Sequence, residues 1–436
     1  MRRMLWSRLV LPAFRTLHSR VEGRTMRLGT SEFQCLFTDG LKAIAALFAE
    51  HGHELRIAGG AVRDLLSGKQ PQDIDFATSA TPAQMKEMFS AAGVRTINTL
   101  GEKHGTITAR VHEQNFEITT LRVDVTTDGR HAEVEFTTDW QTDSERRDLT
   151  INSMFLGLDG TLYDYFNGME DLKNKKVRFV GDPEKRIQED YLRILRYFRF
   201  YGSVAEHADA HEPQTLVAIE RNASGLAGIA GERIWVELKK TLMGNHASHL
   251  FALIYKLGVA PHIGLPCDGN VVELQRVWER SRASPPRPIT LLSALLRCAD
   301  DVGQLDARLR LSKDERNLAA FVVKHRGELR PDADGDDPLG SIKAFVTDAR
   351  PHGEAKARAS ELLRYLGEAG PAGELDGWRP PAFPVSGHDL RRLGLTSGKE
   401  IGTELQRLRA VWQRSGYRAD KDALLATVRQ GQKSKS

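Results

Sequence analysis

Apolar positions follow two different spacings along the chain, and the change falls near residue 183. Before that point, short apolar or alternating runs are typical of strands. We expect strands over residues 55–58, 74–77, 105–111, 116–121 and 154–158, and helices over residues 33–51 and 82–92. The pattern therefore predicts a mixed sheet flanked by helices in the first part of the chain.

Beyond residue 183 the apolar residues recur at helical spacing, and no strand pattern remains. The helices expected there span residues 184–201, 213–222, 231–243, 246–257, 289–299, 313–324 and 398–413. Segments rich in proline, glycine and aspartate, at residues 331–340 and 370–384, predict loops or linkers. The predicted fold class is α+β, with the sheet first and only helices after it.

Composition places the chain among globular proteins but does not identify a partner. The 436 residues are 40% hydrophobic with a net charge of only +4, so a nucleic-acid-binding surface requires local clustering of cations. No run of about 18 apolar residues occurs, and we expect no membrane span. Cys35, Cys267 and Cys298 lack the spacing of a metal site or a disulfide framework, which favours a reducing compartment.

The first twenty residues contain no acidic residue and mix arginines with bulky apolar residues. The arginines are Arg2, Arg3, Arg8, Arg15 and Arg20. This composition is typical of a mitochondrial presequence, predicted here over residues 1–25, and a disordered basic arm is the alternative. Met26 offers a second start, and initiation there would leave a cytosolic or nuclear form.

A glycine pair stands where the first expected strand passes into a helix. Gly59 and Gly60 carry no Cβ, so backbone N–H groups at this turn can approach a triphosphate. Arg63, one turn into the helix, can reach the same phosphates. The segment therefore predicts a nucleotide-binding turn, and we expect Asp64 to be a capping or structural partner of a nearby helix.

Two carboxylates follow on the next expected strand. Asp73 and Asp75 are two residues apart, so both side chains leave one face and can share Mg²⁺ ions through their oxygens. A solvated turn is the alternative for such a pair, and the nearby glycines favour the metal site. Glu117, on a later strand, is the candidate third carboxylate, and an exposed surface position explains it equally well.

A second cluster of charge precedes an apolar run. Arg147, next to Arg146, suits phosphate oxygens, and Asp148 can accept the hydrogen bond of a ribose 2′-hydroxyl. Simple exposed charge is the alternative, but the apolar residues that follow indicate that the segment docks on the core. The segment therefore predicts contacts with a ribonucleotide.

A repeat of charged residues marks the first long helix after residue 183. Its members recur every three residues and form one polar stripe: Asp190, Arg193, Arg196 and Arg199. An acceptor at Asp190 beside a donor at Arg193 matches the edges of cytosine and adenine, whose amino group lies next to a ring nitrogen. We therefore expect this pair to select CTP and ATP, and a solvated ion pair is the alternative.

Together these segments resemble the class II tRNA nucleotidyltransferases, or CCA-adding enzymes, of the polymerase beta superfamily. The resemblance is carried by GGAVRDLL with DIDF, by RRDLTINSMF and by EDYLRILRYFRF, and it runs over about residues 30–425. It implies that these are the catalytic, ribose-reading and base-reading motifs. It also implies that Asp124, Gly129 and Arg130 belong to a flexible loop that helps to change from C to A addition. It further implies that GERIWVELKK, with Glu232, Arg233 and Glu237, braces the base-reading helix.

The same resemblance implies an activity. The expected reaction is template-independent addition of CCA to the 3′ end of tRNA from CTP and ATP, with Mg²⁺ bound at Asp73 and Asp75 and pyrophosphate released. A bacterial-type poly(A) polymerase and a catalytically inactive RNA-binding protein are the alternative functions. The long loop expected over residues 124–139 favours CCA addition over the first of them.

The resemblance also implies a division of the chain. The expected parts are a presequence (1–25), a catalytic head (26–182), a helical neck (183–250), a helical body (251–335) and a tRNA-binding helical tail (336–436). We expect a monomer or a homodimer.

Overall fold

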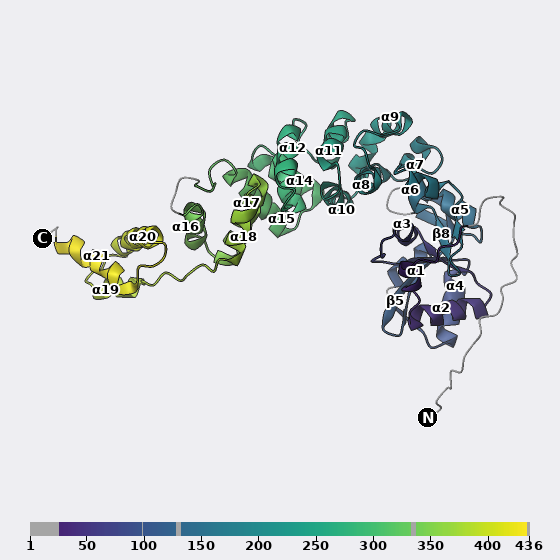
Figure 1. Cartoon of the computed structure of the whole chain (residues 1–436), viewed down its shortest axis with the longest axis horizontal. Helices are drawn as coiled ribbons and strands as arrows, with labels where there is room; N and C mark the ends of the chain where they lie inside the picture. The colour runs from purple at the N-terminus through teal and green to yellow at the C-terminus, as the bar shows by residue number, and fades with distance from the viewer. Residues whose placement is uncertain (1–25, 98, 128–131, 333–336, 434–436) are drawn as a thin grey trace, which may run out of the picture. The chain divides into compact units, whose positions relative to one another are not determined.

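The structure is a computed structural model that describes residues 26–97, 99–127, 132–332 and 337–433. These residues form two compact units, whose elements are labelled in Figure 1. One unit contains the described chain up to Leu121 together with Met154–Tyr165, and the other contains Arg122–Ser153 and the described chain from Phe166 onward. The first holds the large sheet and the second is mostly helical, so the predicted α+β class is confirmed.

Among the described residues, the first unit builds a mixed sheet of seven strands. Its spatial order is β3-β4-β5-β2-β1-β8-β9, in which β2 and β5 are parallel neighbours. The strands are β1 (Leu55–Ala58), β2 (Asp75–Thr78), β3 (Arg95–Ile97), β4 (Thr106–Val111), β5 (Gln114–Thr120), β8 (Phe155–Gly157) and β9 (Leu162–Tyr163). β1, β2, β4, β5 and β8 match the expected strands to within a residue or two, whereas β3 and β9 are too short to leave a pattern.

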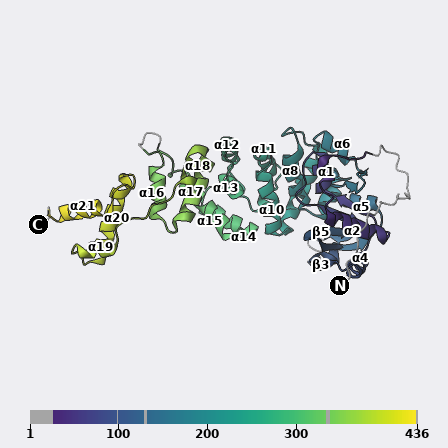
Figure 2. The same cartoon turned by 60° about the horizontal axis from the view of Figure 1, so that its bottom comes forward.

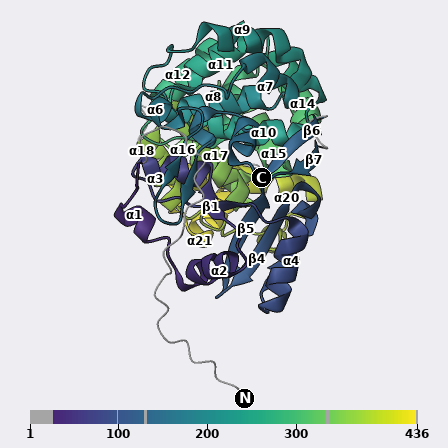
Figure 3. The same ribbon diagram turned by 90° about the vertical axis from the view of Figure 1, so that its right-hand side faces the viewer.

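Helices α2 (Asp39–Glu50) and α4 (Pro82–Ala91) pack against β4, as Figure 3 shows. Phe48 of α2 and Phe89 of α4 meet edge to face, with ring centroids 6.0 Å apart, so both helices share one apolar layer. The remaining helical segments of this unit are α1 (Ser31–Gln34), α3 (Gly60–Leu66) and the 3₁₀ segment η1 (Thr99–His104).

The single helix expected over residues 33–51 is wrong, because two helices occupy this stretch. α1 ends at Gln34, and α2 begins after Thr38, whose hydroxyl oxygen accepts the N–H of Leu41. A threonine cap interrupts the helical backbone without interrupting the apolar spacing. The pattern therefore does not reveal the break.

The first described residues pair with the edge of the same unit. The Met26 carbonyl accepts the Leu162 N–H at 3.0 Å, and the Leu28 N–H donates to the Gly160 carbonyl at 2.8 Å. Leu28 is also buried. Met26 and Leu28, which follow the predicted presequence, thus belong to the first unit, and the presequence itself lies outside the described residues.

The second unit begins with a β-hairpin. β6 (Arg122–Thr127) pairs antiparallel with β7 (Ala132–Phe136), and the pairing is irregular between Asp124 and Thr126. The loop expected over residues 124–139 is therefore wrong for residues 124–127 and 132–136, which are strands, whereas residues 137–139 lie outside any strand. Residues 128–131, between the two strands, lie outside the described part of the chain.

Helices make up the rest of the second unit. In chain order they are α5 (Trp140–Glu145), η2 (Thr150–Asn152), α6 (Gly168–Lys173), α7 (Pro183–Glu189), α8 (Arg193–Val204), α9 (Pro213–Asn222), η3 (Ala223–Gly228), α10 (Gly231–Leu242), α11 (Ala247–Lys256), η4 (Ala260–Ile263), α12 (Val271–Arg280), α13 (Pro288–Leu292), η5 (Ser293–Leu295), α14 (Ala299–Leu309), α15 (Lys313–His325), α16 (Gly340–Asp348), α17 (His352–Leu366), α18 (Ala369–Gly377), α19 (Gly387–Arg392), α20 (Gly398–Arg414) and α21 (Lys421–Lys433). Figure 2 shows α8, α10 and α11 side by side, in agreement with their mutual contacts. α9, α10, α11, α15 and α20 match expected helices to within a residue or two.

Two other expectations for this unit are wrong. The helix expected over residues 289–299 is divided, because the backbone is extended at Leu296 between η5 and α14. The loop expected over residues 370–384 contains α18, whose Ala372 and Leu375 are buried in a cluster with residues of α17. Tertiary packing thus overrides the weak helix propensity of a glycine-rich stretch.

No helix in the described residues is long and apolar enough to cross a membrane. Cys35, Cys267 and Cys298 are exposed free thiols.

Candidate active site

Two rows of side chains cross the central strands of the large sheet. One row is apolar and buried, and consists of Ile107, Ile118, Phe76 and Ile57. Because side chains alternate along a strand, the adjacent row lies on the opposite face, and consists of Thr108, Glu117, Asp75 and Ala58. The buried row anchors the strands to the core and thereby fixes the positions of the two carboxylates in the other row.

Asp75 and Glu117 are direct neighbours in this second row. Their Cα atoms are paired in the parallel ladder of β2 and β5, and both residues are exposed to solvent. Partial desolvation of its carboxyl, followed by the negative charges of Asp75 and Asp73, raises the pKa of Glu117. The three carboxylates therefore lie near enough to repel one another, and a divalent cation relieves such repulsion.

Asp73 lies in the bend before β2, because the strand begins at Asp75. The expectation that both aspartates lie on the strand is therefore wrong for Asp73. Within the described residues, no three acidic, histidine or cysteine side chains are already gathered closely enough to enclose a metal ion. Asp73, Asp75 and Glu117 fit an ion held by one or two carboxylates together with phosphate oxygens and water, which is the usual arrangement for Mg²⁺.

The turn of Gly59 and Gly60 lies at the same end of the sheet as these carboxylates. Ala58, the last residue of β1, pairs with Asp75, so the turn follows beside the start of β2. Gly59 has a φ of 63°, which glycine adopts without strain, and its N–H donates to the Met154 carbonyl at 3.1 Å. The turn is thus held by Met154, the residue before β8, as well as by β1.

Arg63 is held beside this turn by its neighbour in the chain. Its Nη2 and Nε donate to Oδ1 of Asp64 at 2.8 and 3.1 Å. A Cβ at Gly60 would lie 3.8 Å from Arg63 Nη2, so the guanidinium reaches back to the glycine pair. Asp64 braces this cation of α3, in keeping with the structural role expected of it.

In the second unit, Asp148 is a buried partner of Arg196. Arg196 Nε donates to Asp148 Oδ2 at 2.6 Å, and the Leu149 N–H donates to Oδ1 at 2.8 Å. Burial opposes ionisation, but Arg196 and these hydrogen bonds hold the pKa of Asp148 below its ordinary value. The alternative of simple exposed charge is therefore wrong for Asp148, which exposes 8% of its side chain.

Arg146 and Arg147 share a buried carboxylate that the charge pattern alone does not single out. Asp143 exposes 2% of its side chain; its Oδ1 accepts from Arg146 Nη2 at 2.9 Å and its Oδ2 from Arg147 Nη2 at 3.3 Å. The signal available in the sequence is the spacing, since an acid three and four residues before two arginines shares a helix face with them. Arg147 also donates to the Asn152 carbonyl at 3.3 Å.

Asp190 occupies a break between α7 and α8. Its backbone is extended, its Oδ1 accepts the Leu192 N–H at 3.0 Å, and its Oδ2 accepts from Arg233 Nη2 of α10 at 2.9 Å. The continuous helix expected over residues 184–201 is wrong here, because an aspartate that bonds to the backbone two residues on competes with the helix. The bracing contact from Arg233 that the family resemblance implies is present.

Arg193, the first residue of α8, is held by three acceptors. Its Nη1 donates to Glu189 Oε2 at 2.6 Å and to the Arg186 carbonyl at 3.1 Å, and its Nη2 donates to the Arg146 carbonyl at 2.7 Å. Asp190 and Arg193 thus each bind a partner of their own. Glu189 is a further contact that the charge repeat does not single out.

The far end of the polar stripe is braced in the same way. Arg199 of α8 pairs with Glu237 of α10 at 3.3 Å, and Glu237 exposes 6% of its side chain.

Of the residues expected in the flexible loop, Asp124 lies in β6, 4.0 Å from Arg146 and 3.9 Å from Arg122. Gly129 and Arg130, the other expected residues of the flexible loop, lie outside the described residues.

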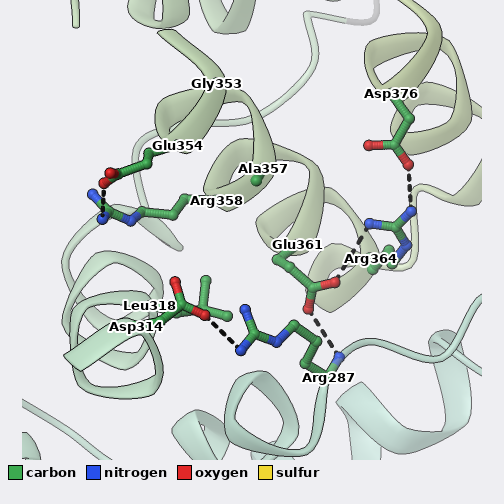
Figure 4. Close-up of a pocket in the computed structure, with 10 residues that line it drawn as sticks. All are labelled: Arg287, Asp314, Leu318, Gly353, Glu354, Ala357, Arg358, Glu361, Arg364 and Asp376. Atoms are coloured by element: carbon green, nitrogen blue, oxygen red, sulfur yellow. Dashed lines mark hydrogen bonds and ion pairs between the residues drawn. The ribbon is translucent and has the colours of Figure 1, made fainter. Parts of the chain in front are cut away.

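A separate pocket of about 390 Å³ lies among α15, α17 and α18, and Figure 4 shows its lining. Its arginines are paired with acids: Arg287 with Asp314 at 2.7 Å, Arg358 with Glu354 at 2.8 Å and Arg364 with Glu361 at 3.4 Å. Because the cations are neutralised locally, this pocket does not have the charge that a nucleotide triphosphate requires. Its lining includes none of the predicted site residues.

Two family descriptions match the chain, "Poly A polymerase head domain" over residues 55–178 and "Probable RNA and SrmB-binding site of polymerase A" over residues 211–265. CCA tRNA nucleotidyltransferase 1, mitochondrial, of Mus musculus is 62% identical, over 93% of this chain and 93% of its own length. The chain belongs to the CCA tRNA nucleotidyltransferases. The Homo sapiens member of the same name is 60% identical, over 97% of this chain and 96% of its own length.

Solved structures of CCA tRNA nucleotidyltransferases share the fold. The CCA-adding enzyme of Bacillus stearothermophilus in complex with CTP matches with a TM-score of 0.72 and 25% identity, over 93% of this chain and 100% of that one. The Thermotoga maritima CCA-adding enzyme complexed with tRNA matches in fold, with a TM-score of 0.64 and 19% identity, over 92% of this chain and 96% of that one.

Proposed function

We propose that this chain adds C, C and A to the 3′ end of tRNA without a template, using CTP and ATP and releasing pyrophosphate. The observation that carries the proposal is the placement of Asp75 and Glu117 beside the turn of Gly59 and Gly60. Identities of 62% and 60% to CCA tRNA nucleotidyltransferases over nearly the whole chain support it. The complex of the Bacillus stearothermophilus enzyme with CTP supports the choice of substrate.

In this proposal Asp73 and Asp75 hold Mg²⁺ through their oxygens, and Glu117 is the third carboxylate. When bound, such ions would supply activation of the attacking 3′-hydroxyl and stabilisation of the leaving pyrophosphate. Because neither Gly59 nor Gly60 has a Cβ, the triphosphate can approach the backbone at the start of α3, and Arg63 adds a cation beside it. The mutual repulsion of the carboxylates supports the metal assignment, because it disfavours three bare charges in one place.

The residues of the second unit would recognise the nucleoside. Asp148 accepts a hydrogen bond from the ribose 2′-hydroxyl, and Arg147 donates to phosphate. Asp190 and Arg193 offer an acceptor and a donor to the amino-bearing edges of cytosine and adenine. Their partners support this role, because Arg233 and Glu189 fix the orientation of both groups in advance.

The sequence predicts that Arg196 and Arg199 bind the nucleotide directly. In the structure each pairs with a buried acid, Asp148 or Glu237, so we assign them first to orienting α8. Asp124 and the hairpin that contains it are assigned to the change from C to A addition, as the family resemblance implies.

The division into head (26–182), neck (183–250), body (251–335) and tail (336–436) stays a prediction, with the tail as the tRNA-binding part. We propose a mitochondrial location, since the relatives named above are mitochondrial, and a second form that starts at Met26. A monomer or a homodimer stays the expected assembly.

The deciding experiment offers radiolabelled CTP and ATP to tRNA that ends before CCA. We expect two C residues and one A residue to be added, after which extension stops. The match to a poly(A) polymerase head domain favours a second candidate, and long A tracts without CMP would establish it. No incorporation of any nucleotide would favour a catalytically inactive RNA-binding protein.

A further inference from the structure

Backbone carbonyls at the C-terminal end of α5 accept hydrogen bonds from two arginine side chains. The Glu145 carbonyl accepts from Arg186 Nη1 at 2.8 Å, and the next carbonyl, that of Arg146, accepts from Arg193 Nη2 at 2.7 Å. The last carbonyls of a helix have no partner within the helix and carry partial negative charge, so they suit cations. Arg193 therefore takes part of its orientation from the end of α5.

One buried carboxylate holds this end of α5 together. Asp143 lies in the last turn; its Oδ1 accepts from Arg146 Nε at 3.0 Å and from the backbone N–H of Arg122 at 3.0 Å. Its Oδ2 accepts from Arg147 Nε and Nη2 at 3.4 and 3.3 Å. With 2% of its side chain exposed, Asp143 binds the α5 terminus to the first residue of the hairpin.

We propose that Asp143 is a positioning residue for nucleotide selection, acting through the Arg146 carbonyl on Arg193 and directly on Arg147. This inference rests on the proposed function, because the orientation of Arg193 matters for selection only when that residue contacts a base. Because Asp143 is buried, we expect it to act through these groups and not to contact the nucleotide itself.

The charge of Asp143 is essential to this arrangement. Burial opposes its ionisation, but Arg146, Arg147 and the Arg122 N–H hold the pKa of Asp143 below its ordinary value. An asparagine keeps the shape, yet its NH₂ group would face guanidinium donors and could not accept from them. The substitution therefore releases one of the two arginines and loosens the terminus that presents the Arg146 carbonyl.

The test compares Asp143→Asn and Asp143→Glu with Asp139→Asn as the matched control. Asp139 caps the other end of α5, where its Oδ1 accepts the Gln141 N–H at 2.9 Å, and asparagine caps equally well. The full chain is used with tRNA lacking CCA. The measurements are KM and kcat for CTP and ATP, incorporation of UMP and GMP, and the thermal unfolding midpoint.

We expect Asp143→Asn to raise the ratio of UMP to CMP incorporation and the KM for CTP each by about tenfold or more, as expected when a charged hydrogen-bond acceptor is removed. Asp143→Glu should lie between this variant and the wild type, and Asp139→Asn should match the wild type. If Asp143→Asn does not fold, the test depends on Asp143→Glu. When that variant has the thermal stability of the wild type, the proposal still requires a change in its KM for CTP or in its base choice.

Two outcomes separate the inference from the proposed function. A wild-type chain that adds neither C nor A refutes the proposed function. A wild-type chain that adds CCA, together with folded Asp143 variants whose KM and base choice are unchanged, overturns the positioning role alone. A fall in kcat and stability with unchanged KM and base choice also overturns it, because that pattern is purely structural.

Discussion

Asp75 and Glu117 are opposite one another in the parallel ladder of β2 and β5, and the charge of Asp75 contributes to the raised pKa of Glu117. The ladder fixes the distance between their Cα atoms, so the two side chains cannot separate by backbone motion without breaking the sheet. Their repulsion is therefore a permanent property of the fold.

Loss of the Asp75 carboxylate should impair nucleotide addition more than loss of the Glu117 carboxylate. We expect Asp75→Asn to lower kcat/KM for CMP addition on the order of a thousandfold, because a metal ligand is lost, and Glu117→Gln to lower it about tenfold. Titration of the rate with Mg²⁺ should show a weaker apparent affinity in both variants. Glu113→Gln is the control, since that side chain is 90% exposed in the turn between β4 and β5. A thousandfold loss there, or none in Asp75→Asn, would contradict the assignment.

Base choice should relax when Asp190 loses its brace. We expect Arg233→Gln to raise UMP incorporation about tenfold relative to CMP, because Asp190 loses a charge-assisted partner and its orientation. Incorporation of all four nucleotides, measured separately, checks the prediction. Lys240→Gln, an exposed position on the same helix, should leave the ratio unchanged.

Gly231 at the start of α10 has no room for a side chain. A Cβ there would lie 1.9 Å from the Arg308 carbonyl oxygen, a backbone atom, so we expect Gly231→Ala to lower the free energy of unfolding by roughly 1–3 kcal/mol. A Cβ at Gly303, within α14, would meet no other described atom within 4 Å, and Gly303→Ala should be neutral or stabilising by up to about 1 kcal/mol. Chemical denaturation of both variants measures the two free energies of unfolding. Equal values would show that the backbone at Arg308 moves to make room for a side chain at position 231.

Acidification should weaken the packing around His211. Burial of the ring, followed by the nearby His249, lowers the pKa of His211 to about 4, and its Nδ1 lies 2.8 Å from the Tyr197 hydroxyl. The unfolded chain protonates this ring below about pH 6.5. The stability contribution is therefore complete above that pH and is lost as the pH falls from 6.5 towards 4.

The measurement is the thermal unfolding midpoint at about pH 7.5 and about pH 5. His211→Gln should lose less of its midpoint between the two values than the wild type does. His388→Gln, at an exposed position, should follow the wild type. An identical loss in His211→Gln would assign the acid sensitivity to other groups.

A chain that starts at Met26 should keep the stability of the first unit. It retains the Met26 carbonyl and the Leu28 N–H that pair with the sheet edge. Deletion through Leu28 removes both bonds and a buried leucine, so we expect a lower unfolding midpoint and a free energy of unfolding reduced by about 2 kcal/mol or more. Equal midpoints for the two truncations would show that this edge contributes nothing.

The apolar pattern predicts most of the helices and strands whose buried side chains recur at the spacing typical of that element. β1 is fully buried and α9 presents a regular apolar face, so the predicted and observed bounds of both agree. The pattern fails where a single polar side chain decides the backbone, as at Thr38 and Asp190. It also fails for α18, whose helix depends on burial against α17.

The candidate site is predictable in part for the same reason. Residue type and spacing single out Asp73, Asp75 and Glu117, and strand pairing brings two of them into one row. For Asp143 the spacing from Arg146 and Arg147 is a weak signal, because its importance comes from burial and from its contact with the backbone N–H of Arg122. Neither property is encoded in local periodicity.

The acceptor that Arg193 uses on α5 is a main-chain carbonyl, and every amino acid at position 146 supplies the same atom. Mutation at this codon can erase the ion pairs of the Arg146 side chain while the acceptor persists. An insertion or deletion within α5 is different, because each residue rotates the helix by about 100° and advances it by about 1.5 Å. Evolution is therefore freer to vary the identity of this residue than to vary the length of the helix that presents it.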